Sequence, residues 1–385
     1  MDFTPDETQR AAADLAAGAL AKAAGGEDGD PGATASWRAL ADAGLLALTL
    51  PESLEGDGLG AAETAAVVRE AGRAGSRAPA WPVLSLGLTP LVALGGAERC
   101  PDLLRVVAAG DALLTAALHE PSSPMTDRPA ATATTTDGAS MNGTAMDGTA
   151  TSGSARGKWR LDGVKTAVPL ATEAECILVP ATLPGGGTGV FLVEPSAPGV
   201  RLTPAPTASG APEAVLRLDG AETGPPLAEP SDSEPGRALR VLHRHALAGA
   251  AAFGDGLLAG ALALTTTHLA TREQFGRPLA TFQAVAQQVA DVYVASRTVE
   301  LAAESAAWRL AAGREPDAEL EVAAYWLAEQ APLALATCHH LHGGVGLDET
   351  YPLHRYSSLL KDLIRGIGGA SLRLDRVGAL TGGAA

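Results

Sequence analysis

The chain has 385 residues, of which 46% are hydrophobic and 19% charged, a composition typical of a folded protein with a sizeable core. The formal net charge of −16 argues against nucleic acid as the main partner, because phosphate binding requires a basic surface. The three cysteines are too few and too scattered for a disulfide framework, so we expect a cytoplasmic protein with reduced thiols. We interpret the abundance of alanine, glycine and arginine as the compositional bias of a GC-rich genome.

Neither a signal peptide nor membrane insertion is expected. The opening MDFTPDETQR has neither the basic nor the apolar region of a secretory signal. The apolar stretch 246–264 is rich in alanine and glycine, which favours a buried helix over a membrane span.

The N-terminal part is predicted to be helical. Segments 5–25 and 60–76 are alanine-rich with helical periodicity. Between them, residues 37–60 suggest a helix, a short extended turn and a glycine-rich loop. We therefore expect a helical domain over residues 1–112.

The middle of the chain changes character. Strand-like runs separated by glycine and proline predict an antiparallel β domain over residues 113–225: KWRLDG (158–163), CILVPAT (176–182), GVFLVEP (189–195) and AVLRLDG (214–220). A short tandem repeat at 141–150 suggests a flexible loop. Residues 220–236 are interpreted as a linker.

Residues 226–385 are predicted to form a helical bundle. Long helices are expected over 237–275, 281–312 and 316–342. Pro278 forces a break between the first two, and Thr281 is the expected N-cap of the second. The predicted fold class is mainly α with a central β domain.

The junction TREQFGRPLATFQAVAQQVADVYV (271–294) carries the most information. An arginine, a glutamine and free N–H groups at a helix start can hold a phosphate. An ordinary helix–turn–helix with a capping arginine explains the same residues, and the local pattern leaves both interpretations open.

The stretch CHHLHGGVG (338–346) concentrates possible metal ligands. His339 and His340 are adjacent and therefore diverge by about 100° on a helix. Cys338 and His342 share a face, but two ligands do not make a closed zinc site. We predict no metal here.

Several motifs in order resemble the acyl-CoA dehydrogenase family. Its R-x-x-F-G pattern, the following F-Q and a helix ending A-D match Arg272, Phe275, Gly276, Phe282, Gln283, Ala290 and Asp291. LHEP (118–121), WRLDGVKTAV (159–168) and LHGGVG (341–346) are similar to further family motifs. The stretch HGGVGLDETYPLHRYSSLLKDL resembles actinobacterial members that act on CoA thioesters of sterol side chains.

This resemblance implies an N-terminal helical domain, a middle β domain and a C-terminal four-helix bundle, with FAD shared between the subunits of an oligomer. The ADP part of a neighbouring subunit's FAD would contact Arg272, Gln274, Phe275, Gln283, His340, Gly343 and Gly344. The isoalloxazine would lie against Leu118, His119, Ala167, Val168 and Pro169.

The expected catalytic base is missing. Dehydrogenation of an acyl-CoA needs a carboxylate within reach of the α-carbon. The two positions at which the family places this glutamate match Gly368 and Ala246, and neither residue can accept a proton. The catalytic residue is therefore unknown from sequence.

Three hypotheses remain open. The chain is a base-lacking subunit of a heteromeric dehydrogenase, with the glutamate supplied by a paralogous partner. Alternatively, it is self-sufficient and uses Asp348, Glu349 or Glu120. Otherwise the scaffold serves a flavin-dependent monooxygenase or a non-catalytic subunit that binds acyl-CoA and flavin. For the dehydrogenases, the expected partners are an acyl-CoA substrate and electron-transfer flavoprotein or another acceptor.

Overall fold

The computed structural model describes residues 4–25, 32–135, 157–228, 234 and 236–382. The N-terminal part is helical, as expected, and Asp6 and Gln9 form a capping box at its first helix. Its elements are α1 (Glu7–Ala24), α2 (Gly32–Asp42), η1 (Glu52–Leu54), α3 (Ala61–Arg73), η2 (Trp81–Leu88), α4 (Thr89–Ala93), α5 (Gly96–Arg99) and α6 (Pro101–Ala108).

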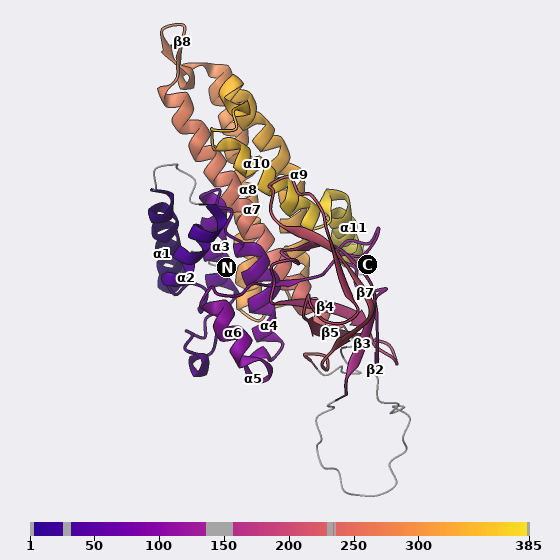
Figure 1. Ribbon diagram of the computed structural model, residues 1–385. Coiled ribbons are helices and arrows are strands. Elements are labelled where there is room, and N and C mark those ends of the chain that lie inside the picture. Colours follow the sequence, from indigo (N-terminus) through magenta and orange to yellow (C-terminus); the bar gives the residue numbers. More distant parts are fainter. Residues whose placement is uncertain (1–3, 26–31, 136–156, 229–233, 235, 383–385) are drawn as a thin grey trace, which may run out of the picture.

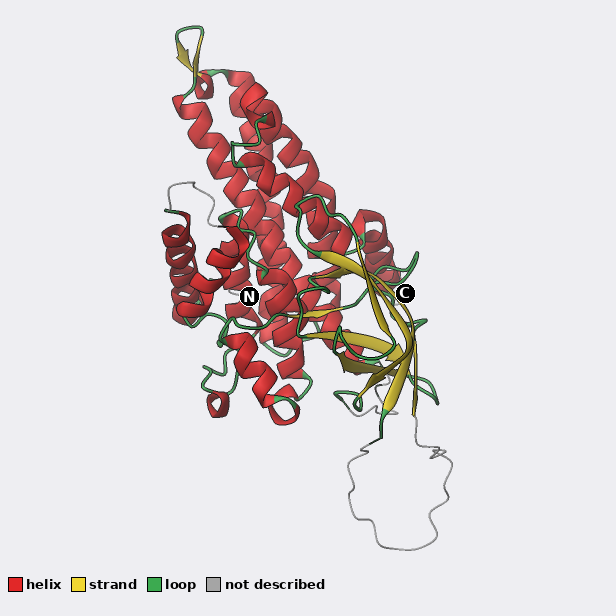
Figure 2. Ribbon diagram, viewed as in Figure 1, coloured by secondary structure: helices red, strands yellow, loops and turns green. Residues whose placement is uncertain are grey.

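A curled sheet follows (Figure 2). Its order is β1-β4-β2-β3-β7-β6, with β5 paired to β4. The strands are β1 (Leu114–Ala116), β2 (Thr132–Thr135), β3 (Trp159–Pro169), β4 (Cys176–Thr182), β5 (Thr188–Val193), β6 (Val200–Pro204) and β7 (Glu213–Thr223).

The sheet corrects two expectations. It is mixed rather than purely antiparallel, because β1 and β2 both pair with β4 in parallel. The start of the predicted linker belongs to β7, which continues to Thr223. The repeat at 141–150 lies outside the described residues.

The C-terminal part is a bundle of α7, α8, α9 and α10, with α11 packed against α9 (Figure 1). A hairpin between α7 and α8 lies at the far end of the bundle from the sheet. The elements are α7 (Arg237–Thr271), β8 (Glu273–Gln274), β9 (Arg277–Pro278), η3 (Leu279–Thr281), α8 (Gln283–Ala311), α9 (Asp317–His342), η4 (Gly343–Leu347), α10 (Leu353–Gly366) and α11 (Gly369–Gly382).

The break at Pro278 is confirmed, but Thr281 does not cap α8. Its hydroxyl donates to the Pro278 carbonyl over 2.7 Å. Phe282 occupies the N-cap position and gives no side-chain cap. The first N–H groups of α8 therefore have no capping side chain.

Helix α7 lies at the centre of the larger hydrophobic core, which joins the N-terminal helices to the bundle, while the sheet has a core of its own. Within the described residues, α7 is the helix with the length and hydropathy of a membrane span, and 78% of that window is buried in the structure. The buried helix expected over 246–264 is confirmed. The domain boundaries at 112 and 225 stay predictions.

Close contact between α3 and α7 depends on glycine. A Cβ on Gly256 would lie 2.0 Å from the Arg69 carbonyl oxygen, and one on Gly72 would lie 2.2 Å from that of Phe253. Backbone atoms cannot yield as a flexible side chain can, so both sites require glycine.

Gly256→Ala is expected to lower the free energy of unfolding by roughly 1–3 kcal/mol, because α3 and α7 must move apart. Gly18→Ala on the exposed face of α1, where nothing lies within 4 Å, should instead raise it by about 0.5–1 kcal/mol. Urea denaturation of both variants measures the difference. Equal effects would contradict the role of this contact.

Candidate functional site

The two predicted flavin loops lie side by side. The Thr166 N–H donates to the His119 carbonyl over 3.0 Å and joins the loops in an isolated antiparallel bridge. Ala167 has a φ of 50°, in the left-handed region, where the register of β3 against β7 shifts. The two sequence motifs therefore build one local structure.

A cleft of about 510 Å³ opens beside these loops, between the N-terminal helices, the sheet and α10. Ala167 and Pro169 line it. Leu118, His119 and Val168 are buried, at 5%, 8% and 0% exposure, so their side chains pack in the interior. The loops therefore reach the cleft mainly through Ala167 and Pro169.

His119 joins the flavin loop to the end of α10. Its Nε2 lies 2.9 Å from the Gly366 carbonyl oxygen. Burial lowers the pKa of His119, so the neutral ring donates from Nε2. His119 is thus occupied by a structural contact.

Glu120 is held in a buried ion pair. Its Oε1 lies 2.7 Å from Lys165 Nζ, and its carboxylate accepts the N–H groups of Ala130 (2.6 Å) and Ala131 (3.0 Å). Burial raises the pKa of Glu120, but the Lys165 and backbone hydrogen bonds outweigh burial and lower the pKa overall. A carboxylate stabilised in this way is a poor proton acceptor.

Trp81 lies beside one of the two expected base positions, Ala246, and against Gly366. Its indole Nε1 donates to the Ala246 carbonyl over 3.1 Å. A Cβ on Gly366 would lie 2.7 Å from the Trp81 ring. Gly368 has a φ of 84°, a conformation in which any side chain is strained. The local structure therefore suits the small residues found here.

The carboxylates lining the cleft are engaged or exposed. Arg365 donates to both oxygens of Glu213, over 2.9 and 2.6 Å. Asp362 accepts the backbone N–H groups of Ala208 (2.9 Å) and Ser209 (2.8 Å). Glu173 is exposed at the rim. Sequence reasoning missed Trp81, Glu213 and Arg365, because no local motif marks their meeting.

The predicted ADP-binding residues gather at the opposite end of the molecule. Arg272, Gln274 and Gln283 are exposed around the hairpin, and Phe275 is 91% exposed with a φ of 53°. Figure 1 shows this hairpin far from the sheet. From Ala246, beside the cleft, to Arg272 the helical rise of about 1.5 Å per residue gives roughly 40 Å.

The His/Cys stretch lies near the same end, because His342 stacks on His268 of α7 with ring centroids 4.5 Å apart. His339 contacts Gly346 O and Ser357 Oγ, and His342 contacts Cys338 O and Tyr351 Oη. Among the described residues, no group of three potential ligands is arranged for a metal. His340 is exposed, and Gly343 and Gly344 have open space around them.

The hairpin end has the donors that an anionic dinucleotide requires. It presents the Arg272 guanidinium, the Gln274 and Gln283 amides and the uncapped N-terminus of α8. The exposed Phe275 ring offers an apolar surface to an aromatic base. The residues present therefore fit FAD at this end, and the Ala167 turn fits a flat ring at the cleft.

Known proteins resemble this chain over nearly its whole length. Family models for the acyl-CoA dehydrogenase N-terminal and C-terminal domains match residues 5–111 and 240–363. The chain is 41% identical over 379 residues to the acyl-CoA dehydrogenase FadE28 of Mycobacterium tuberculosis, covering 98% of both chains.

Two solved structures are similar over nearly the whole chain. A variant of the Tcur3481–Tcur3483 steroid ACAD has a TM-score of 0.83 and 33% identity, covering 98% of this chain and 99% of that one. The ChsE4–ChsE5 complex of Mycobacterium tuberculosis has a TM-score of 0.81 and 30% identity, covering 98% of each chain.

The chain belongs to the acyl-CoA dehydrogenase family. It is therefore an oxidoreductase of that class with FAD as its cofactor, and the sequence resemblance and expected fold class are confirmed.

The Glu120–Lys165 pair should act as a structural unit. Glu120→Ala is expected to cost about 3–5 kcal/mol of unfolding free energy, because Lys165 is left buried without a partner. Glu222→Ala, which removes an exposed pair with Arg160 on the same sheet, should cost less than about 1 kcal/mol. Thermal unfolding compares the two, and similar losses would refute the structural role.

Proposed function

We propose that this chain is a base-lacking subunit of a heteromeric acyl-CoA dehydrogenase that forms an α,β double bond in an acyl-CoA thioester. The observation that carries the proposal is the state of the two base positions. Ala246 and Gly368 bear no acid, and Trp81 packs against Ala246 and Gly366. A paralogous subunit then supplies the glutamate.

The separation of the cofactor residues supports an assembly. The hairpin group lies roughly 40 Å from the Ala167 turn along α7, so a single chain does not bring both groups to one flavin. We assign the hairpin residues, with His340, Gly343 and Gly344, to the ADP part of FAD in the neighbouring subunit. We assign Ala167 and Pro169, which line this chain's own cleft, to the isoalloxazine side, with the buried Leu118, His119 and Val168 behind them.

The names of the similar structures support a mixed assembly and a bulky substrate. One is named as a steroid ACAD with two components, Tcur3481 and Tcur3483, and the other as a ChsE4–ChsE5 complex. We therefore propose a CoA thioester with a steroid-sized acyl group. Electron-transfer flavoprotein is the proposed acceptor of the electrons, and the cytoplasm the proposed location.

The alternative acids are less suitable as bases. Asp348 accepts the Thr350 N–H (2.9 Å) and hydroxyl (2.7 Å) within a surface turn, and Glu349 is exposed beside it. Glu120 is held by Lys165. These positions favour a base from another subunit over a self-sufficient enzyme.

The chemistry divides between the subunits. The partner's carboxylate would remove the α-proton, and bound FAD would supply the acceptor for the hydride of the β-carbon. Arg272, Gln274 and Gln283 bind and orient the anionic part of the cofactor. The buried rings of Trp37 and Trp81 exclude water from the inner wall of this chain's cleft.

The isolated chain is expected not to bleach a flavin absorbance band when a steroid acyl-CoA or butyryl-CoA is added anaerobically. Co-expression with a paralogue that carries the glutamate should give a complex that does, because base and cofactor then meet. A spectrum of each preparation tests this. Rapid bleaching by the purified single chain would rule out the base-lacking assignment.

Removal of the hairpin contacts should lower the flavin content of the complex without unfolding the protein. In the mixed assembly, Arg272→Ala and Phe275→Ala are expected to reduce bound FAD per complex about tenfold or more, since each loses a contact to the ADP part. Arg201→Ala, an exposed arginine of β6, is the matched control. Unchanged flavin in both hairpin variants would contradict the assignment.

A further inference from the structure

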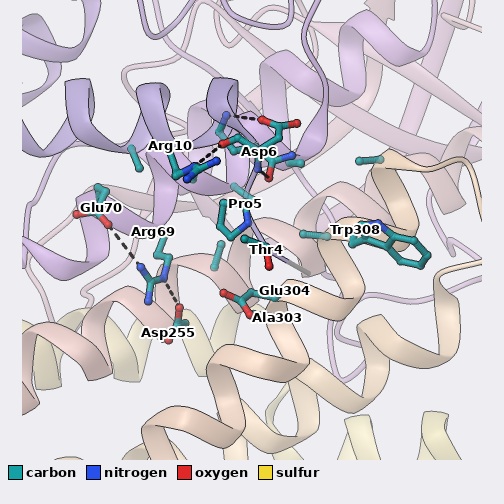
Figure 3. A pocket seen from close by; sticks show the side chains of 18 residues that line it. Thr4, Pro5, Asp6, Arg10, Arg69, Glu70, Asp255, Ala303, Glu304 and Trp308 are labelled. Carbon is teal, nitrogen blue, oxygen red and sulfur yellow. Dashed lines mark hydrogen bonds and ion pairs between the residues drawn. The ribbon is translucent and has the colours of Figure 1, made fainter. Parts of the chain in front are cut away.

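A second pocket lies away from the cleft, between α1, α3, α7 and α8 (Figure 3). Its volume is about 480 Å³, a size typical of small-molecule sites. Small side chains from all four helices line it, including Ala13, Ala65, Ala252 and Ala307. It shares no lining residue with the cleft.

Arg69 at one end of this pocket is fully engaged. Its Nε donates to Asp255 Oδ2 over 2.5 Å and its Nη2 to Glu300 Oε1 over 3.1 Å. Its Nη1 lies 3.6 Å from Glu70 Oε1. The Arg69 guanidinium thus contacts three carboxylates, and each of its three nitrogens has an acidic neighbour.

Asp255 has an oxygen that lacks a donor. The residue is 1% exposed, and its Oδ1 has no hydrogen-bond partner within the described part of the chain. Burial raises the pKa of Asp255 to about 6, even though Arg69 opposes that shift. A buried carboxylate oxygen without a donor is costly, so a ligand N–H or O–H would stabilise it.

The charges around the pocket do not balance. Arg73 lies 3.8 Å from Glu70, and Arg297 lies 2.5 Å from Glu300. Among the described residues, Glu304 has no ion pair, and burial raises its pKa. The pocket and its ion-pair network therefore hold four guanidiniums and five carboxylates, one positive charge too few: Arg10, Arg69, Arg73 and Arg297 against Asp6, Glu70, Asp255, Glu300 and Glu304.

We propose that this pocket binds an organic monocation, a primary ammonium ion with an apolar body. Its N–H donates to Asp255 Oδ1, and its charge completes the balance between Asp255 and Glu304. In Figure 3, Arg69 and Asp255 lie at one end of the pocket and Trp308 at the other, with Glu304 between them. The apolar body packs against the alanines on the Trp308 side.

Three matched probes separate charge from hydrogen bonding. Tryptamine carries an ammonium group, tryptophol a neutral hydroxyl and indoleacetate a carboxylate on the same ring. In calorimetric titrations of the full chain, we expect tryptamine to bind at least about tenfold more tightly than tryptophol, and indoleacetate not to bind. Equal affinity for amine and alcohol, or no binding of tryptamine, would overturn the proposal.

Two variants locate the site. Asp255→Asn keeps the shape but removes the charge, and Ala307→Phe fills the cavity from α8; both should weaken tryptamine binding at least about tenfold. Asp102→Asn, an exposed carboxylate of α6, is the control. If Asp255→Asn fails to fold, the test rests on Ala307→Phe. An unchanged affinity of that variant for tryptamine would refute the site.

The pH dependence gives an independent readout. Because burial holds the pKa of Asp255 at about 6, proton and ammonium compete for it. Tryptamine affinity should be constant above that pH and fall by up to about tenfold per pH unit below it. A flat profile from pH 7 to pH 5 would contradict Asp255 as the ligand. The other charged groups of the pocket and its ion-pair network are Asp6, Arg10, Arg69, Glu70, Arg73, Arg297, Glu300 and Glu304.

Discussion

The length of α7 separates the two groups of residues that we propose bind the cofactor, and the proposed function depends on this separation. Its N-terminal half lies against Trp81 beside the cleft, while its C-terminus carries the exposed hairpin at the far end of the bundle (Figure 1). A continuous helix of 35 residues is a stiff spacer of about 50 Å. Phe275 is 91% exposed, and contact of this apolar ring with water is unfavourable unless another surface covers it. In the proposed assembly, the neighbouring subunit that covers this end also completes the flavin site.

The loss of an acid at both base positions also has a packing consequence. A glutamate at Gly368 would occupy a backbone conformation that disfavours side chains, and one at Ala246 would enter a position that is 1% exposed. Beside Ala246 the structure places the Trp81 indole, whose N–H donates to the Ala246 carbonyl, while a side chain on Gly368 would meet Leu372 and Pro124. An unpaired buried carboxylate is costly, whereas a hydrogen-bonded tryptophan stabilises the core. Under the proposed function, the small residues and Trp81 form a packed wall that holds no catalytic base of its own.

Local patterns predicted the parts of this structure that local physics determines. Periodicity placed the long helices, β4 matched its predicted bounds, and Pro278 lies in the break between α7 and α8, although α7 already ends at Thr271. Contacts between distant segments were beyond such patterns. Trp81 meets Ala246 across 165 positions, and Arg365 meets Glu213 across 152. The parallel pairing of β1 with β4 likewise depends on how the whole sheet closes. Thr281 is not the cap because α8 begins at Gln283, which puts Phe282 at the N-cap position.

The abundance of small residues, interpreted from sequence as compositional bias, has a packing role on α7. A Cβ on Gly249 would lie 1.9 Å from Ser85 Oγ, and one on Gly256 would lie 2.0 Å from the Arg69 carbonyl oxygen. Such close approach brings α3 against α7 and sets Arg69 beside Asp255. Elsewhere along α3 and α8, the alanine side chains are too short to fill the space between the helices, so the pocket stays open. The small residues that a biased composition supplies therefore have distinct packing roles. Glycine allows α7 to approach neighbouring backbones, alanine lines the pocket, and Asp255 is the acid buried between α3 and α7.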